Sequence, residues 1–321
     1  MSNPIKNRYD FVFLFDVKDG NPNGDPDQIN LPRADAENQQ GLVTDVCIKR
    51  KVRNYIQLKH DLKPPYDIFI RQRDINSEDS YLNKIIGKAK GETTSEKRKD
   101  LCKDYFDIRT FGAVLTTGEK ESGGDESESE EKAKGDNRKK EKKEKRVKGA
   151  GTVRGPVQFT FARSQDRIYQ ADHSITRCCV TTEREKDKQV GTDREFATTF
   201  GRKATVPYGL YRMHGFISVI DAQKTGFSET DLELLWEALL NAFENDRAAA
   251  RGEMNPRKLI IFKHTNHLGN ARSGELFDLV NVKKNKDENG KDIDLPRKWQ
   301  DYNIVIAKDK LPKEIEIIEK L

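Results

Sequence analysis

Segment 8–17 constrains the fold most strongly, because its apolar side chains lie on both faces of a predicted strand. A strand that is apolar on both faces has to be covered on both sides by other parts of the chain. We therefore expect this segment to be a central strand of a sheet. Its first face carries Phe11, Phe13 and Phe15, and its second face carries Val12 and Leu14.

Strand and helix patterns alternate along the rest of the chain. A helix is expected after Thr44, which can cap it, and another after Ser228, where Asp231 resembles the partner in a capping box. With the strands, these helices predict two β-α-β units, typical of an α+β, ferredoxin-like sheet with helices on one face and the other face free to bind. Further strands are expected at 66–71, 157–163, 206–220, 259–262, 276–282 and 302–306.

Two long insertions interrupt the predicted sheet domain, which comprises residues 1–115 and 150–321. The first insertion, residues 116–149, runs from an acidic block into a basic block and has almost no apolar side chains, so it cannot bury enough surface to fold. We expect a disordered, solvated segment; the alternative is a basic arm that touches nucleic acid. The second insertion, residues 164–205, also exceeds the usual loop length.

Composition excludes several classes of protein. The formal net charge of +5 permits nucleic-acid binding without requiring it. No apolar run approaches the roughly 18 residues of a membrane span, and the N-terminus lacks a signal-peptide pattern, so we expect a cytoplasmic protein without membrane contact. The cysteines form no CxxC pair, and His264 and His267 could share a metal only with a third ligand, so no metal or other cofactor is expected.

The loop 19–27 is rich in asparagine, glycine, proline and aspartate. Asn21, Asn23 and Gly24 permit positive φ and expose backbone N–H groups, which lets the chain approach a phosphate or sugar closely. Two other interpretations stay open: the loop could be a set of Asx turns, or its aspartates could gather a divalent cation, with a spacing that does not match an EF-hand. The aspartates are Asp16, Asp19, Asp25 and Asp27.

The helix predicted after Thr44 has a cationic flank. Its apolar residues fall on one stripe, and Lys49, Arg50 and Arg53 occupy the adjacent arc. Such a flank either binds phosphates or is a solvated helix face.

Several motifs resemble one known family, in the same order along the chain. The loop 19–27, the Leu-Pro-Arg-Ala-Asp run at 31–35 and the segment 41–53 together resemble the N-terminal signature of the backbone subunit of type I CRISPR interference complexes, a member of the RAMP superfamily, closest to subtype I-C. The resemblance spans residues 9–282 without the charged insertion. Further matching pieces lie at 107–113, 155–159, 200–203, 206–211 and 270–274.

The resemblance implies an RRM-like palm with a protruding thumb hairpin, which maps to the insertion 164–205. It implies that copies of the subunit stack head to tail along a CRISPR guide RNA, where each thumb kinks the RNA and the spacer is presented for pairing with target DNA in antiviral defence. Other subunits of this complex, called Cascade, do the cutting. The implied protein is therefore non-catalytic and lies in the prokaryotic cytoplasm, and its partners are guide RNA, target DNA through the guide, its own copies and other Cascade subunits.

A subunit that holds any spacer sequence has to contact phosphates and sugars rather than base edges. Cationic side chains and backbone amides should therefore form its RNA-binding site, while Arg109 is expected to serve either subunit packing or RNA binding. No residue is predicted to be catalytic. The predicted RNA-binding residues are Asn21, Asn23, Gly24, Arg33, Lys49, Arg50, Arg53, Arg163, His173, Arg177, Arg202, Lys203, Asn270, Arg272 and Ser273.

Two alternative functions stay open at the level of sequence. Related backbone subunits of other CRISPR types cut RNA with a loop aspartate and a metal, and Asp25 or Asp27 could act in that way, but no histidine beside them offers a general base. A generic RNA-binding protein is the other alternative. It would bind RNA as a monomer, without the fixed repeat of an assembly.

Overall fold

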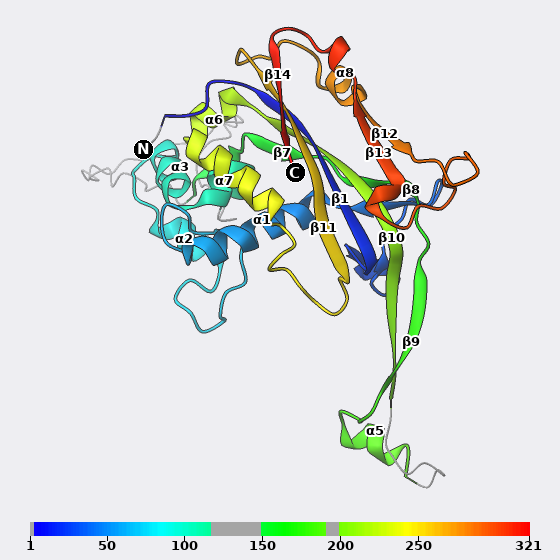
Figure 1. Cartoon of the computed structure of the whole chain (residues 1–321). Helices are drawn as coiled ribbons and strands as arrows, with labels where there is room; N and C mark the ends of the chain where they lie inside the picture. The colour runs from blue at the N-terminus through cyan, green and yellow to red at the C-terminus, as the bar shows by residue number, and fades with distance from the viewer. Residues whose placement is uncertain (1–2, 117–148, 191–198) are drawn as a thin grey trace, which may run out of the picture.

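The computed structural model describes residues 3–116, 149–190 and 199–321 of the chain (Figure 1). The predicted charged insertion, 116–149, lies outside the described residues except at its two ends. The described part is built around one large antiparallel sheet with helices packed on it, which confirms the predicted α+β class.

Strands and helices alternate along the chain. The helices are α1 Asp45–His60, α2 Leu82–Lys88, α3 Thr94–Asp104, α4 Phe106–Phe111, α5 Glu183–Asp187, α6 Val219–Thr225, α7 Glu229–Leu240 and α8 Ser273–Asp278. The strands are β1 Tyr9–Gly20, β2 Gly24–Asp25, β3 Leu31–Pro32, β4 Gln40–Val43, β5 Gly112–Leu115, β6 Gly151–Arg154, β7 Val157–Phe159, β8 Ala162–Arg167, β9 Ala171–Arg177, β10 Thr199–Ile217, β11 Glu253–His264, β12 Val280–Lys284, β13 Tyr302–Ile306 and β14 Ile315–Lys320.

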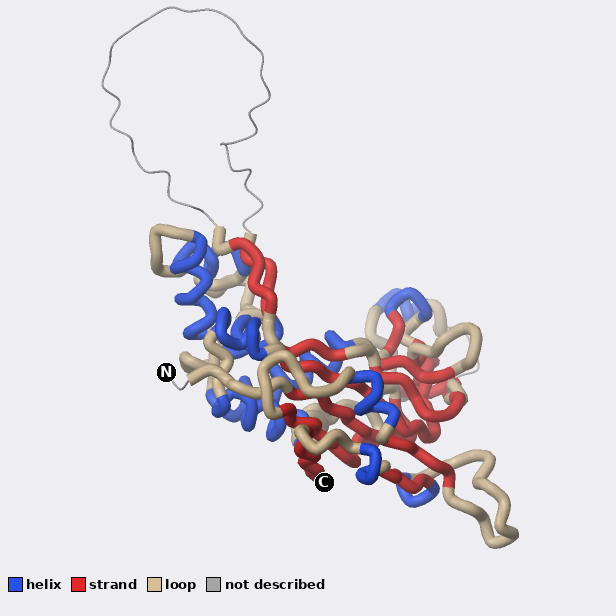
Figure 2. The backbone as a smooth tube through the Cα atoms, turned by 90° about the horizontal axis from the view of Figure 1, so that it is seen from above, coloured by secondary structure: helices blue, strands red, loops and turns tan. Residues whose placement is uncertain are grey.

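β1 lies in the centre of the sheet, as predicted. Over most of its length it pairs antiparallel with β10 on one side and with β11 on the other. The strand order is β14-β11-β1-β10-β8-β4, and β7 and β9 pair with other stretches of β10. Figure 2 shows that the strands run through the middle of the molecule and that most helices lie at the end that carries the N-terminus.

The two predicted helices begin at their predicted caps. The Thr44 hydroxyl accepts a hydrogen bond from the N–H of Cys47 at the start of α1. At the start of α7, Ser228 and Asp231 form a reciprocal capping box. These local hydrogen bonds satisfy N–H groups that have no partner inside a helix, and therefore fix where each helix starts.

Both faces of the sheet are covered. The phenylalanines of β1 pack against α1 and α7 in the larger core. On the other face, Val12 and Leu14 share a second core with Phe277 of α8, Val280 of β12 and Tyr302 of β13. This cover confirms the prediction from the two apolar faces of β1. The expectation that the ferredoxin-like sheet leaves its second face free is wrong, because the segment from α8 to β13 forms a further layer over it.

Three predicted strands differ from the structure. Segment 66–71 forms no strand, because the Asp107 carboxylate accepts the N–H groups of Phe69 (2.7 Å) and Ile70 (3.0 Å) that a sheet would use. Segment 157–163 is split between β7 and β8 at Thr160, whose N–H donates to the carbonyl of His214. The first half of segment 276–282 is the end of α8, since its apolar residues face the second core from a short helix.

A smaller core lies beside the sheet, where α2, α3 and α4 pack with the hairpin of β5 and β6. Leu115 and Gly151 are partners at the open end of this hairpin, and the N–H of Ala150 donates to the carbonyl of Leu115 at 2.9 Å. The described residues on either side of the segment 117–148 therefore lie side by side.

Residues 117–148 should be dispensable for folding. Replacing them with a short glycine-serine turn should raise the free energy of unfolding by up to about 2 kcal/mol, because each halving of a loop saves roughly 0.6 kcal/mol of closure entropy. Urea unfolding of the two proteins measures the difference. A less stable or unfolded product would show that the segment contributes to the core.

β9 and the first half of β10 form a two-stranded hairpin that projects away from the sheet, with α5 near its far end (Figure 1). We call residues 171–205 the arm. None of its described residues belongs to the hydrophobic cores, which end at Ile168 and resume at Val206. In the described part of the chain, no helix has the length and apolar character needed to cross a membrane.

Candidate nucleic-acid interface

The asparagine-rich loop is held against the start of α1. The Asn23 side-chain oxygen accepts hydrogen bonds from the N–H (2.9 Å) and the hydroxyl (3.0 Å) of Thr44. Asn21 donates from its side chain to the carbonyl of Asn30 at 2.6 Å. Both side chains therefore shape the loop itself, as the Asx-turn interpretation anticipated.

Gly24 begins the small β2-β3 hairpin of the same loop, and Arg33 directly follows it. A side chain at Gly24 would approach the carbonyl oxygen of Asn30 to 3.1 Å, so the close packing of the loop favours glycine. Arg33 forms an ion pair with Asp25 (3.4 Å) and is partly exposed. This part of the loop is compact and carries one partly neutralised cation.

The three cations on the flank of α1 differ in their exposure and in their ion pairs. Lys49 pairs with Asp45 at 2.9 Å, and Arg53 pairs with Asp107 at 2.8 Å, and both cations also lie over the ring of Phe111. Arg50 differs from them. It is exposed, and its side chain donates a hydrogen bond to Asn54 at 3.2 Å without an ion-pair partner among the described residues.

Arg50 lies between two hollows in the surface. The first, of about 170 Å³, is also lined by Arg53 and Arg71 and by three amide side chains. The second, of about 200 Å³, lies at the N-terminus of α1 and is also lined by Lys51 and Arg251. Among the described residues, no carboxylate lines either hollow. Both hollows are therefore suited to an anion, and the second also faces the positive end of the helix dipole.

Three of the cations that line the hollows, Arg71, Arg251 and Lys51, were not predicted from the sequence. Arg71 is the last residue of the segment 66–71 that was expected to be a strand, and Arg251 lies in the loop before β11, about two hundred residues from α1 in sequence. Arg251 and Lys51 both contact the Asp246 carboxylate. Burial lowers the pKa of Lys51 to about 8. Lys51 is thus still protonated at neutral pH, and its charge is shared with that carboxylate.

The arm carries its predicted residues on two faces. His173 and Lys203 are opposite one another, on the same face as Arg177, because paired residues in a ladder share a face. Arg202 lies on the other face with the exposed Phe200, and its nearest acid, Asp172, is 3.8 Å away. The arm therefore presents cations on both sides.

Arg163 lies on β8, near the root of the arm. It pairs with Asp35 at 2.7 Å and is half exposed. The guanidinium beside Asp35 and the Glu37 N–H lower the pKa of the Asp35 carboxyl, so this ion pair is kept at neutral pH.

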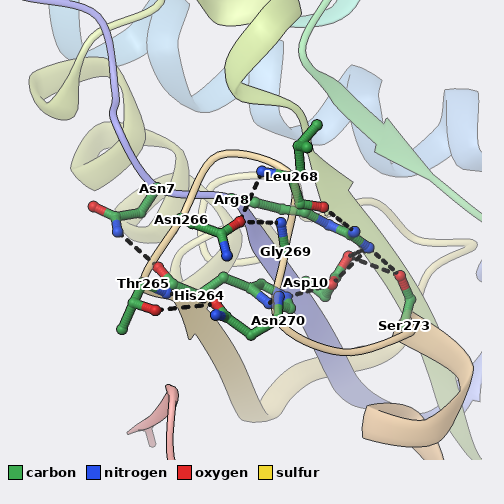
Figure 3. Close-up of polar contacts among 10 residues, drawn as sticks. All are labelled: Asn7, Arg8, Asp10, His264, Thr265, Asn266, Leu268, Gly269, Asn270 and Ser273. Atoms are coloured by element: carbon green, nitrogen blue, oxygen red, sulfur yellow. Dashed lines mark hydrogen bonds and ion pairs between the residues drawn. The ribbon is translucent and has the colours of Figure 1, made fainter.

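The predicted late loop is fixed by a buried network around Asp10 (Figure 3). The Asp10 carboxylate contacts His264 at 2.8 Å, accepts the Ser273 hydroxyl at 3.1 Å and pairs with Arg8 at 3.0 Å. Asn270 donates its N–H to the other ring nitrogen of His264. Asn270 and Ser273 therefore hold the loop in place, whereas Arg272, just before α8, is exposed.

No three His, Cys, Asp or Glu side chains within the described ranges come together as a metal site. The loop aspartates do not converge. Asp16 is buried, forms an ion pair with Arg257 at 2.8 Å and accepts a hydrogen bond from the Tyr208 hydroxyl at 3.1 Å. Asp25 pairs with Arg33. The interpretation of loop 19–27 as a cation site therefore has no geometry to support it.

The family model described as "CRISPR-associated protein Cas7" matches residues 7–307. The chain belongs to the Cas7 family. The match covers the sheet except β14, the arm and the α8-β13 layer in one span, and it confirms the resemblance found in the sequence; subtype I-C stays a prediction.

This Cas7-family chain is 25% identical over 286 residues to the CRISPR-associated protein Cas7 of Haloferax volcanii, covering 86% of this chain and 75% of the relative. It is also similar to a chain of a solved CRISPR RNA-guided surveillance complex, with 12% identity, a TM-score of 0.41, and coverage of 79% of this chain and 68% of that one. A second chain, from such a complex in a pre-nicking state, shows 13% identity, a TM-score of 0.43, and coverage of 79% and 78%.

Proposed function

We propose that this protein is a non-catalytic backbone subunit that binds a CRISPR guide RNA along its phosphates. The observation that carries the proposal is the pair of carboxylate-free hollows on either side of Arg50, in a chain of the Cas7 family. A protein that accepts any guide sequence needs contacts to phosphate and sugar, which are the same for every nucleotide. Exposed guanidinium groups and the N-terminus of a helix supply such contacts.

The RNA-binding surface of this proposal runs from the hollows to the arm. Arg50 and Arg251 contact the backbone at the start of α1, and Arg163 and the arm cations contact it further along. Lys49 and Arg53 act in a supporting role, because the ion pair of Arg53 with Asp107 and the packing of both cations over the ring of Phe111 hold α1 against α4 and keep Arg50 in place. Asn21, Asn23, Asn270 and Ser273 likewise shape the loops that border the RNA, and Gly24, Arg33 and Arg272 remain predicted contacts.

The fold suits this role. The order β11-β1-β10-β7, antiparallel throughout with α1 and α7 on one face, supports a ferredoxin-like, RRM-like palm. The arm, which leaves the palm between β8 and β10, is the counterpart of the thumb hairpin. Its place in the chain matches the insertion 164–205 that the family resemblance implied.

In this proposal the partners are the guide RNA, further copies of the same chain placed head to tail, other Cascade subunits, and target DNA through the guide. The complex is a Cascade of subtype I-C, the subtype that the sequence motifs resemble. It acts in the prokaryotic cytoplasm as part of antiviral defence.

The ribonuclease alternative is less well supported. Cutting RNA with a metal would require Asp25 or Asp27 to share the ion with further ligands, and Asp25 instead pairs with Arg33 and accepts the N–H of Asp27. RNA bound to the protein should therefore stay intact in the presence of magnesium or manganese. Cutting that disappears in an Asp25→Ala and Asp27→Ala variant would support the alternative instead.

Replacing Arg50 with alanine should weaken RNA binding equally for unrelated sequences. One lost phosphate contact should reduce the slope of log affinity against log salt by about 0.7 per bound copy, because a single strand releases fewer counterions than a duplex. Filter binding of two unrelated RNAs over a range of salt concentrations measures both effects.

Lys313→Ala is the matched control, since Lys313 is exposed and lines neither hollow. It should leave the slope unchanged. If Arg50→Ala and Lys313→Ala behave alike, or if the Arg50 variant loses affinity for one sequence only, the hollows are not a phosphate site.

A further inference from the structure

Two exposed cysteines are neighbours in the arm. Cys178 and Cys179 follow directly after β9, and the proposed function does not use them. The segment between β9 and α5, to which they belong, lies towards the far end of the arm and contributes no residue to the hydrophobic cores (Figure 1). Two thiols of one chain are therefore adjacent, open to solvent and without a packing role.

A turn held by side-chain hydrogen bonds contains this pair. The Arg177 guanidinium, at the end of β9, donates to the Thr181 hydroxyl at 2.7 Å. The N–H of Thr181 donates to the Glu185 carboxylate at 2.9 Å, which ties the far side of the turn to α5. Neither cysteine has a hydrogen-bond partner among the described residues. A change of shape at the cysteines therefore acts first on Arg177 and Thr181.

The four cysteines differ in their access to an oxidant. Cys102 is buried, and burial raises the pKa of its thiol to about 11, so it stays protonated and is a poor nucleophile at neutral pH. Cys47 is half-buried and donates its thiol to the carbonyl of Pro22 at 3.6 Å. The pair in the arm combines exposure with a second thiol beside the first, and a second thiol converts an oxidised cysteine into a disulfide before it is oxidised further.

We propose that Cys178 and Cys179 form a reversible redox site, which hydrogen peroxide oxidises to a disulfide between the two neighbouring residues. One thiolate attacks the O–O bond of the peroxide, becomes a sulfenic acid and releases water. The second thiol displaces the sulfenic hydroxyl as another water and forms the S–S bond. The electrons lost by the two sulfurs reduce the peroxide to water. A low-molecular-weight thiol reverses the reaction by exchange and is itself oxidised to its disulfide.

The spacing of the two residues makes such a disulfide easy to reduce. The peptide bond between them is trans, so their Cα atoms are about 3.8 Å apart. Most disulfides join Cα atoms that are roughly 4.4–6.8 Å apart, and departures from this range store strain. Strained and exposed disulfides are the labile, regulatory ones. The dithiol is therefore the resting state in a compartment rich in thiols, and the disulfide lasts only while the oxidant is present.

The effect of oxidation on RNA binding rests on the proposed function, in which the arm cations contact the guide. A ring closed through one peptide bond bends the chain between Arg177 and Thr181. This bend moves the Arg177 side chain away from the face that it shares with His173 and Lys203. Oxidation should therefore lower the affinity for RNA about tenfold, the effect of losing one charge-assisted contact.

The chemical test uses the full reduced chain, hydrogen peroxide and peptide mass spectrometry. Trypsin cleaves after Arg177 and after Arg184, and the peptide between these sites holds both neighbouring cysteines and no other cysteine. After oxidation this peptide should resist alkylation and be lighter by two hydrogen atoms, and an added thiol should restore alkylation. Cys102→Ala, which removes a buried thiol, is the control and should react in the same way. Two alkylated cysteines after oxidation, or a disulfide that joins two chains, would overturn the proposal.

The functional test compares RNA binding by the reduced and the oxidised chain in filter-binding titrations. The double variant Cys178→Ser with Cys179→Ser cannot form the ring, so it should bind RNA as the reduced chain does and show no response to peroxide. If the ring closes and the affinity for RNA stays unchanged, the site does not act on the arm and the inferred regulation is wrong. If no form of the chain binds RNA, the proposed function fails, while the peptide masses still decide whether the redox site exists.

Discussion

Replacing Arg109 with alanine should lower the free energy of unfolding by about 3–5 kcal/mol, the usual effect of removing one partner from a buried ion pair. Arg109 pairs in bidentate fashion with Asp231, with N–O distances of 2.7 and 3.1 Å. It also donates to the carbonyls of Cys102 (2.7 Å) and Pro65 (3.1 Å). The same carboxylate caps α7 through Ser228. The variant therefore leaves a buried carboxylate without its cation, and two carbonyls without the donor they now have, at the junction of α3, α4 and α7.

Urea unfolding of the purified chain measures this effect. Arg109→Lys should not restore stability, because an ammonium group cannot reproduce the planar fork of the guanidinium. Arg247→Ala is the matched control: Arg247 pairs with Glu244 at 3.2 Å, and both side chains are half exposed, so its loss should change stability by less than about 1 kcal/mol. An Arg109→Ala variant as stable as this control would contradict the expected role.

Features that depend on neighbouring residues were predictable from the sequence. The starts of α1 and α7 follow from Thr44 and from Ser228 with Asp231, because a cap acts over three residues. The central position of β1 follows from its two apolar faces. The pairing of Lys49 with Asp45 was also within reach, since the two lie four apart on one helix, where opposite charges meet.

Features that depend on distant partners were not predictable. Arg53 forms an ion pair with Asp107, and Arg109 forms one with Asp231. The sequence around neither arginine indicates which distant carboxylate it pairs with. Arg109, expected to serve subunit packing or RNA, instead ties helices together within the chain. The contribution of Arg251 to the second hollow is hidden for the same reason.

The apolar residues on both faces of β1 predicted that both faces are covered, but the element that covers the second face was missed for a different reason. α8 spans Ser273–Asp278, which is too short to show a helical period, and its buried Leu276 and Phe277 read equally well as the start of a strand. Once that segment is taken as a strand, no element remains to cover Val12 and Leu14. The wrong assignment of this one short helix, α8, therefore led to the wrong prediction for the whole second face of the sheet.

Removing the arm should abolish cooperative assembly on RNA and leave the palm folded. In the proposed function each copy contacts both the RNA and its neighbour, so binding of one copy strengthens binding of the next. Binding of the unaltered protein should then grow in steps as the RNA is lengthened. A variant in which a short glycine-serine linker replaces residues 172–204 should lose about 100-fold in affinity for RNA that holds several copies, the scale on which linked contacts act, and far less for RNA that holds one.

Mobility-shift titrations with RNAs of increasing length measure this difference. The linker can close the gap, because Ala171 and Thr205 are partners in the β9-β10 ladder. No described residue of 172–204 belongs to a hydrophobic core, so urea unfolding should give the variant nearly the stability of the complete chain, which separates loss of assembly from loss of folding. If the variant still binds in steps, the arm does not link the copies. If the unaltered protein binds long RNA without steps, it acts as a single RNA-binding module rather than as the backbone of an assembly.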